Sequence, residues 1–293
     1  MDFLRPASWR EALEIRAARP EATVLAGGTD VLVEVNFGHR RPEALLDLTG
    51  VAELRDWAEP GGRVRVGAGV PYARLIEELG DRLPGLAMAA RTVGSPQIRN
   101  RGTLGGNLGS ASPAGDGHPP LLAAGAEVEL ASVRGTRTVP VAEFFTGPKR
   151  SVLAEDELIA AVLLDPAAGP QQFSKVGTRN AMVIAVCAFA LALDPARERV
   201  GTGIGSAGPV PFRAAAAERF LVGELTASGQ WARPRALPEL VANRFGELVA
   251  AAAAPIDDVR GTAGYRRHAL GVLARRALHR TWDEHLGRGR RCA

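Results

Sequence analysis

Residues 103–116 constrain this chain most, because their composition suits neither a buried strand nor a surface helix. The stretch combines paired glycines, a side-chain amide, small hydroxyls and one carboxylate, and its only bulky side chains are two leucines. A glycine lets the backbone approach a ligand closely, since no Cβ intervenes. We therefore expect this segment to lie directly against a bound ligand.

A second glycine pair, Gly27-Gly28, follows residues 23–26, which we expect to form a short buried strand. Either pair alone is typical of a tight turn. Together they suggest one extended, phosphate-bearing ligand, because glycine-rich turns expose converging N–H donors. The carboxylate of Asp30 cannot contact a phosphate, since two anions repel, so we expect it to cap the next turn. Neither pair forms the G-x-G-x-x-G fingerprint of a nicotinamide-binding Rossmann unit.

The order of expected elements favours an α+β fold in two units. A capping box formed by Ser8 and Glu11 predicts a helix to about residue 18. Strands dominate the next part of the chain, and three helical patterns close it. We predict strands over residues 23–26, 45–48, 63–68, 127–130, 137–141, 157–164 and 200–204, and helices over residues 73–79, 119–124, 213–222, 237–252 and 262–286. The boundary falls near residue 170, and the predicted domains cover residues 1–168 and 171–286.

Composition excludes several classes of protein. The apolar fraction of 46% and the charged fraction of 23% are those of a globular protein. The net charge is +4, but basic residues are scattered and aromatic residues make up 5%, so we expect no nucleic-acid partner. Charges, prolines or glycines interrupt every apolar run, so no membrane span is expected. Cys187 and Cys292 are too few for a disulfide framework or an iron–sulfur cluster, and a cytoplasmic location is expected.

Individual titratable residues leave alternatives open. Only Lys149 and Lys175 among the 36 basic residues are lysines. Each marks either a position that needs a compact ammonium or chance retention. His118, beside Asp116, is a candidate for the wall of the ligand pocket. No histidine has metal-site spacing, so we expect no metal site. The pair Arg266-Arg267 is expected on the solvated face of the last helix, or against a partner subunit.

The glycine segments also carry a family resemblance. Residues 24–30, 95–107 and 111–116 resemble the two flavin-binding loops of the FAD-carrying medium subunits of xanthine-dehydrogenase-type molybdenum hydroxylases. The likeness covers nearly the whole chain, since residues 2–6, 143–147, 173–175, 206–209 and 265–268 also fit the family.

That resemblance implies a fold and a place in a larger enzyme. It implies a vanillyl-alcohol-oxidase (PCMH)-type FAD-binding domain of two α+β subdomains. A smaller α+β domain of the CO-dehydrogenase-flavoprotein type follows. It also implies partners: a large molybdopterin subunit that hydroxylates the substrate and a small subunit with two [2Fe–2S] clusters, arranged as a dimer of heterotrimers. The chain would pass electrons through FAD to NAD⁺ or another acceptor.

The resemblance also assigns residues to the FAD site, and none of them is catalytic. The first loop and residues 103–107 would hold the pyrophosphate and ribityl chain, and Asp116 would accept a hydrogen bond from a hydroxyl or a ring N–H. The ammonium of Lys175 would stabilise reduced, anionic flavin, and the backbone of Ile159 would contact the adenine. The predicted FAD-binding residues are Val24, Leu25, Ala26, Gly27, Gly28, Thr29, Asp30, Val31, Thr103, Leu104, Gly105, Gly106, Asn107, Ser112, Asp116, Ile159 and Lys175.

Two other functions remain as alternatives. A free-standing FAD oxidase or reductase of the same fold would need its own substrate base, and the sequence offers no compelling one. A structural or assembly protein that has lost FAD is opposed by the intact glycine pairs and by Asn107, Asp116 and Lys175. The hydroxylated substrate cannot be read from this chain, because the molybdenum subunit selects it.

Overall fold

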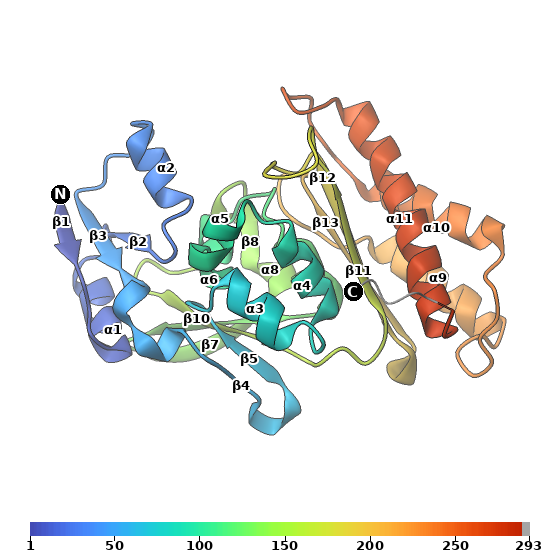
Figure 1. The fold of residues 1–293 in the computed structure, drawn as a ribbon, viewed down its shortest axis with the longest axis horizontal. Helices are drawn as coiled ribbons and strands as arrows, with labels where there is room; N and C mark the ends of the chain where they lie inside the picture. Colours follow the sequence, from blue (N-terminus) through green and yellow to red (C-terminus); the bar gives the residue numbers. More distant parts are fainter. Residues whose placement is uncertain (289–293) are drawn as a thin grey trace.

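The computed structural model describes residues 1–288 of the 293-residue chain, so Cys292 lies outside the described residues. Strands and short helices fill its first half, and three longer helices pack beside a last sheet at its end (Figure 1). The predicted mixture of strands followed by helices is therefore present. Short 3₁₀ turns connect some elements, at Leu48–Gly50, Ala52–Leu54, Pro60–Gly62 and Pro195–Arg197.

The N-terminal region is a small parallel sheet with the strand order β1-β3-β2. Its elements are β1 (Asp2–Leu4), α1 (Trp9–Ala18), β2 (Thr23–Leu25), α2 (Val31–Asn36) and β3 (Ala44–Asp47). The predicted start of α1 is confirmed, because Ser8 Oγ accepts a hydrogen bond from the Glu11 N–H at 3.2 Å. The chain leaves β2 directly into the first glycine pair, which places Gly27 and Gly28 at an edge of this sheet.

A five-stranded antiparallel sheet with the order β4-β5-β10-β6-β7 forms the second layer. Its strands are β4 (Trp57–Ala58), β5 (Val64–Gly67), β6 (Glu127–Ser132), β7 (Gly135–Pro140) and β10 (Leu158–Leu164). The remaining elements of this region are α3 (Tyr72–Leu79), α4 (Pro84–Arg91), α5 (Pro96–Arg101), α6 (Leu104–Ser110), α7 (His118–Ala124), α8 (Val141–Phe144), β8 (Phe145–Gly147) and β9 (Arg150–Ser151). The hairpin expected across Arg134-Gly135 is confirmed, since Ser132 pairs with Gly135.

The glycine-rich segment differs from its sequence-based description, because half of it is helical. Residues 104–110 form α6, although their composition suggested neither a helix nor a strand. The helix begins at Thr103, whose Oγ1 accepts a hydrogen bond from the Gly106 N–H at 2.9 Å. Gly105 packs so closely on β5 that a Cβ there would lie 2.6 Å from the Ala68 carbonyl oxygen. Small side chains are thus needed here for helix packing.

The C-terminal region is an antiparallel sheet in the order β11-β12-β13, covered by helices. Its elements are β11 (Gln171–Val176), β12 (Cys187–Asp194), β13 (Arg199–Gly205), α9 (Ala215–Ala227), α10 (Glu239–Ala252) and α11 (Ala263–His285). The three helices share a core with the sheet, in which Phe189 and Trp282 are buried. Against β13 packs α7, because Gly201 and Gly203 leave no Cβ to strike the α7 backbone. Cys187 is buried in this core.

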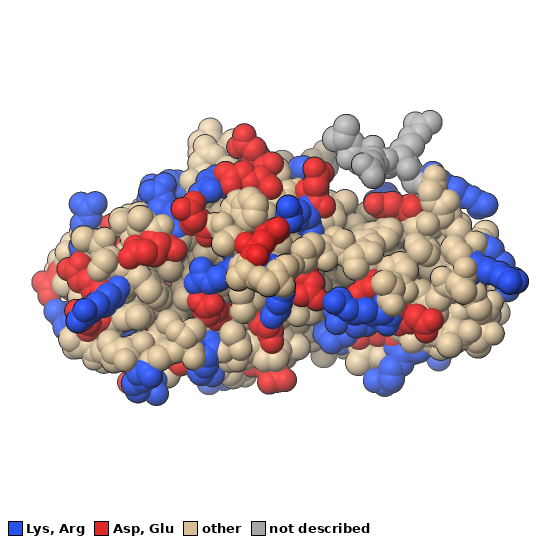
Figure 2. Space-filling model, turned by 90° about the horizontal axis from the view of Figure 1, so that it is seen from below, with Lys and Arg blue, Asp and Glu red and all other residues tan. Residues whose placement is uncertain are grey.

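The last helix corrects one sequence-based expectation. Arg266 does not lie on a solvated face: it is buried, with 4% of its surface exposed. Its guanidinium donates to the Ser206 carbonyl oxygen at 2.8 Å and pairs with Asp258 at 2.5 Å. Ser206 is 60 residues away in sequence and Asp258 lies on the loop just before α11, so the periodicity of the helix itself could not reveal either partner. Arg267 is exposed, as expected. On the face of the molecule shown in Figure 2, Lys and Arg side chains are interspersed with Asp and Glu.

Candidate functional site

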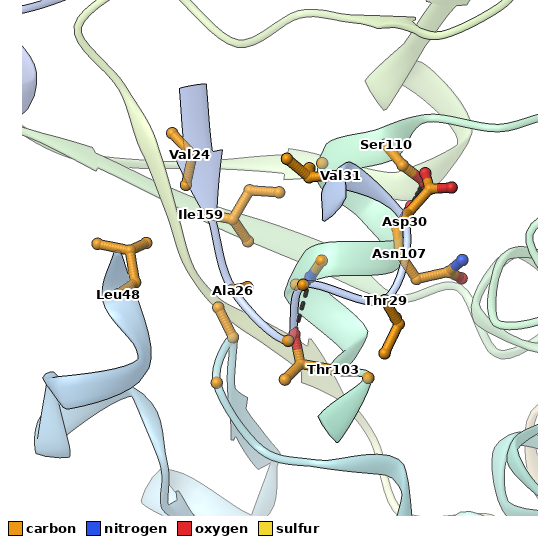
Figure 3. Close-up of a pocket in the computed structure, with 18 of the residues that line it drawn as sticks. Val24, Ala26, Thr29, Asp30, Val31, Leu48, Thr103, Asn107, Ser110 and Ile159 are labelled. Atoms are coloured by element: carbon orange, nitrogen blue, oxygen red, sulfur yellow. Dashed lines mark hydrogen bonds between the residues drawn. The ribbon is translucent and has the colours of Figure 1, made fainter. Parts of the chain in front are cut away.

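A cavity of about 730 Å³ lies between the two N-terminal sheets and the start of α6. Its wall combines the loop after β2, the end of β5, the first turn of α6 and the start of β10 (Figure 3). Ligand sites of drug-sized and cofactor-sized molecules occupy about 300–1,000 Å³. Twelve predicted FAD-binding residues line it: Val24, Ala26, Gly27, Gly28, Thr29, Asp30, Val31, Thr103, Gly105, Gly106, Asn107 and Ile159.

The loop after β2 presents a row of unused hydrogen-bond donors to this cavity. Among the described residues, none accepts a hydrogen bond from the backbone N–H groups of Gly27, Gly28, Thr29, Asp30 or Val31. Gly28 has a φ of +78°, which favours glycine and turns the chain between β2 and α2. These residues are partly or fully exposed at the cavity, so a bound ligand can accept hydrogen bonds from their N–H groups. Successive N–H groups in such a turn form a concavity that binds anions. The residues present therefore fit a dinucleotide that carries a diphosphate.

Asp30 does not cap α2, so the predicted role of its carboxylate is wrong. Its side chain accepts no capping hydrogen bond, and its backbone is helical, with φ −114° and ψ −55°. A capping side chain needs an extended backbone to fold back onto the next turn. Thr103 shows that geometry at the start of α6, with φ −121° and ψ 158°. Asp30 instead lines the cavity.

Three of the paired glycines differ in what surrounds them. A Cβ on Gly27 would strike the carbonyl oxygen of Arg101, and one on Gly105 would strike Ala68. At these positions the protein's own backbone excludes a side chain. Gly106 differs, because its nearest neighbours would be Thr103 Oγ1 at 3.1 Å and the Ala26 Cβ at 3.6 Å. A side chain on Gly106 would thus enter the cavity.

One end of the cavity is apolar. Ile159 and Leu48 lie on the opposite side of the glycine loop from Asn107 (Figure 3). The strand pairing between β10 and β6 is irregular just after Ile159, which turns this part of β10 toward the cavity. Such a wall suits a flat aromatic ring. The assigned contact between the Ile159 backbone and adenine stays a prediction.

Five predicted residues do not line the cavity: Leu25, Leu104, Ser112, Asp116 and Lys175. Asp116 and Lys175 instead form a buried ion pair, with Nζ 2.5 Å from Oδ2. Lys175 also donates to the carbonyl oxygens of Thr92 and Val183, at 2.9 and 3.2 Å. The ion pair lies directly behind the cavity wall. Val93 lines the cavity, and its neighbour Thr92 hydrogen-bonds both Asp116 and Lys175. Burial raises the pKa of Asp116, and the ammonium of Lys175 opposes that shift.

His118 is buried and does not line the cavity, contrary to the sequence-based suggestion. Its Nε2 is 3.1 Å from the Asn107 carbonyl oxygen, and its ring packs 4.6 Å from that of Phe145. Burial lowers the pKa of His118 to about 4. The side chain therefore stays neutral at pH 7 and supports the start of α7 from within.

Several residues of the cavity wall were not among the predicted FAD-binding residues. Lys149 lines it and pairs with Glu34 of α2, so it joins the turn between β8 and β9 to that helix. Tyr72, at the start of α3, also lines it with a buried ring. Rarity was the available signal, because the chain has two lysines and two tyrosines. The cavity wall also includes Arg16, Arg40, Arg55 and Arg101, which nothing in the sequence separates from other arginines.

Within residues 1–288, no helix is both long and apolar enough to cross a membrane. Nor do three or more His, Cys, Asp or Glu side chains gather there in a way that could hold a metal ion.

Comparison with known proteins identifies the family. The family model described as "FAD binding domain in molybdopterin dehydrogenase" matches residues 1–166, and "CO dehydrogenase flavoprotein C-terminal domain" matches residues 172–281. The chain is 32% identical to the xanthine dehydrogenase FAD-binding subunit of Escherichia coli O157:H7, over 94% of both chains. It is 32% identical to the nicotine 6-hydroxylase medium subunit of Paenarthrobacter nicotinovorans, over 94% of this chain and 95% of that one.

A solved structure gives the same answer for the fold. Carbon monoxide dehydrogenase from Hydrogenophaga pseudoflava contains a chain that superposes with a TM-score of 0.87 at 29% identity, over 96% of this chain and 97% of that one. The expected order of an FAD-binding domain and a C-terminal domain of the CO-dehydrogenase-flavoprotein type is confirmed. The chain belongs to the FAD-binding medium subunits of the molybdenum hydroxylases, which are subunits of oxidoreductases.

Proposed function

We propose that this chain is the electron-transfer flavoprotein of a molybdopterin-dependent hydroxylase. Electrons from the [2Fe–2S] clusters of a small partner subunit reach FAD here and leave to NAD⁺ or another acceptor. A large molybdopterin subunit hydroxylates the substrate, and the assembly is a dimer of heterotrimers. The relatives carry the names of enzymes acting on xanthine, nicotine and carbon monoxide, which supports substrate selection on another subunit.

The observation that carries the FAD site is the row of free N–H donors from Gly27 to Val31. We place the diphosphate there, because these donors have no acceptor within residues 1–288. The adenine then lies against Leu48 and Ile159, and the flavin half extends past Asn107 toward Asp116 and Lys175.

In this arrangement Lys175 acts through its positive charge and transfers no proton. When bound, FAD supplies a redox centre that accepts electrons and passes them on. The Lys175 ammonium is fixed by Asp116 and by two carbonyl oxygens, so it is oriented without a ligand. A fixed cation next to the flavin ring favours the reduced, anionic form. Asp116 thus positions Lys175 and offers its second oxygen to a polar group of the ligand.

We also propose domain limits of 1–168 and 171–286. Two observations support them: the family models match residues 1–166 and 172–281, and the strands on either side end at Leu164 and begin at Gln171. The C-terminal core also forms a cluster of its own, which contains Phe189 and Trp282.

The experiment is FAD binding to the purified chain, followed by flavin absorbance and by titration of the FAD-free protein. We expect stoichiometric FAD in the wild type and none in Gly106→Val, because the valine side chain would fill the diphosphate site. Gly223→Val in α9 is the matched control, since a Cβ there meets nothing within 4 Å. It should keep FAD, and thermal unfolding of both variants checks the fold.

Two outcomes would contradict the proposal. Stoichiometric FAD in Gly106→Val would place the diphosphate elsewhere. Steady oxidation of an organic substrate by the isolated chain, without its partners, would favour a free-standing FAD oxidase or reductase instead.

A further inference from the structure

Tyr72 is a buried residue of the cavity wall. It is the first residue of α3, and its N–H donates to the Gly102 carbonyl oxygen at 3.0 Å. Only 2% of its surface is exposed, and it forms part of the cavity wall. The backbone bond and the burial together fix the ring, so the position of its hydroxyl is set by the fold.

The hydroxyl of Tyr72 has no hydrogen-bond partner within residues 1–288. The same is true of Oδ1 of Asp116, the oxygen that Lys175 leaves free. Leaving a buried polar group unpaired costs about 1–3 kcal/mol, so native proteins rarely do so without a reason. Two such oxygens in one region indicate that something absent from the protein itself completes them.

The Tyr72 hydroxyl lies close to the backbone of the residue that follows Asp116. A Cβ built on Gly117, the residue after Asp116, would lie 3.2 Å from the Tyr72 hydroxyl oxygen and 2.8 Å from Asn107 Oδ1. Burial, together with the negative charge of Asp116, raises the pKa of the Tyr72 phenol. Tyr72 therefore stays protonated and can both donate and accept a hydrogen bond.

The position of Tyr72 in the cavity indicates which half of FAD could contact its hydroxyl. The apolar wall at Leu48 and Ile159 lies on one side of the glycine loop and Asn107 on the other (Figure 3). Tyr72 is on the Asn107 side, because both approach Gly117. The adenine half therefore points away from Tyr72, and the flavin half points toward it.

We propose that Tyr72 is a further FAD-binding residue, whose hydroxyl hydrogen-bonds a polar group in the flavin half of the bound cofactor. This inference rests on the proposed function. The group is either a ribityl hydroxyl or a carbonyl of the ring, and both supply the hydrogen-bond partner that residues 1–288 do not offer.

The test is Tyr72→Phe, with three measurements on the purified chain. The affinity for FAD should fall about 3- to 10-fold, which corresponds to one hydrogen bond. The affinity for ADP, which lacks the flavin half, should not change. The FAD-free variant should unfold at the same temperature as the wild type or higher, because an unpaired buried hydroxyl is gone. A residue that only supports the fold would lower both stability and affinity.

The flavin spectrum separates the two sources of the ligand group. A shifted absorbance band in Tyr72→Phe assigns the bond to a ring carbonyl, and an unchanged band with weaker binding assigns it to a ribityl hydroxyl. Tyr265→Phe is the matched control, since the other tyrosine is 50% exposed on α11 and should change nothing. Unchanged FAD affinity in Tyr72→Phe, or equal losses for FAD and ADP, would overturn the proposal. Failure of the wild type to bind FAD would refute the proposed function instead.

Discussion

Both lysines of the chain form ion pairs beside the cavity, but the two pairs have very different surroundings. The side chains of Lys175 and Asp116 are 9% and 10% exposed, whereas those of Lys149 and Glu34 are 61% and 26% exposed. The buried pair joins β11 to the loop before α7. The exposed pair joins α2 to the turn between β8 and β9.

The comparison shows that burial, and not the chemical identity of a pair, decides what the pair contributes. Removing one partner of a buried pair leaves an uncompensated charge at low dielectric and costs about 3–5 kcal/mol. An exposed pair is screened by water and contributes about 0–1 kcal/mol. Lys175 should therefore matter for folding and for the flavin, and Lys149 for little more than the position of α2.

The largest expected effect tests the buried side of the comparison. Lys175→Met should lower the free energy of unfolding of the FAD-free chain by about 3–5 kcal/mol, because Asp116 is left without its counter-ion. Urea unfolding at pH 7 measures this. The double variant Lys175→Met/Asp116→Leu should recover most of the loss, since no buried charge remains. A loss below about 1 kcal/mol in the single variant would show that the pair behaves as an exposed one.

Neither the difference between the lysines nor the pairing itself could be predicted from the sequence. Local signals were sufficient for α1, for the β6–β7 hairpin and for the three last helices, because capping boxes, turn residues and periodicity act over a few positions. Lys175 and Asp116 are 59 residues apart, and the segments that bring them together are distant in sequence.

Other errors have the same physical origin. Arg266 contacts Ser206, 60 residues away, so its burial depends on tertiary packing that its own helix does not encode. Asp30 is a residue type that favours the N-cap position of a helix, but its own backbone is helical and its side chain caps nothing. The sequence was sufficient to locate both glycine loops of the site. It did not reveal that Gly27 and Gly105 pack against other parts of the backbone, whereas Gly106 faces the cavity.

The second-largest expected effect concerns His118, another buried titratable side chain. Its pKa is lowered to about 4 by burial, against an ordinary value of 6.5. Between these values the unfolded chain binds a proton that the folded chain does not. Stability from this group is therefore complete above about pH 6.5 and declines as the pH falls toward 4. The expected loss between pH 7.5 and 4.5 is about 2–3 kcal/mol.

Unfolding by urea across this pH range measures the loss due to His118. His118→Gln is the control, because its amide can still donate to the Asn107 carbonyl oxygen but does not titrate. Carboxylates contribute equally to both proteins, so the difference between the two pH profiles isolates the histidine. Parallel profiles would mean that the imidazole accepts its proton in the folded state without penalty.

The smallest effect tests the exposed side of the comparison. Lys149→Ala should change the free energy of unfolding by less than about 1 kcal/mol. No residue of α2 is buried, so the pair between Glu34 and Lys149 is one of few constraints on that helix beside the cavity. FAD should therefore dissociate about 2- to 5-fold faster from the variant. Stopped-flow recovery of flavin fluorescence measures that rate. Added salt should speed release from the wild type and not from Lys149→Ala, since screening weakens only a pair that is present. A stability loss as large as that of Lys175→Met would break the comparison, because the exposed pair would then behave as a buried one.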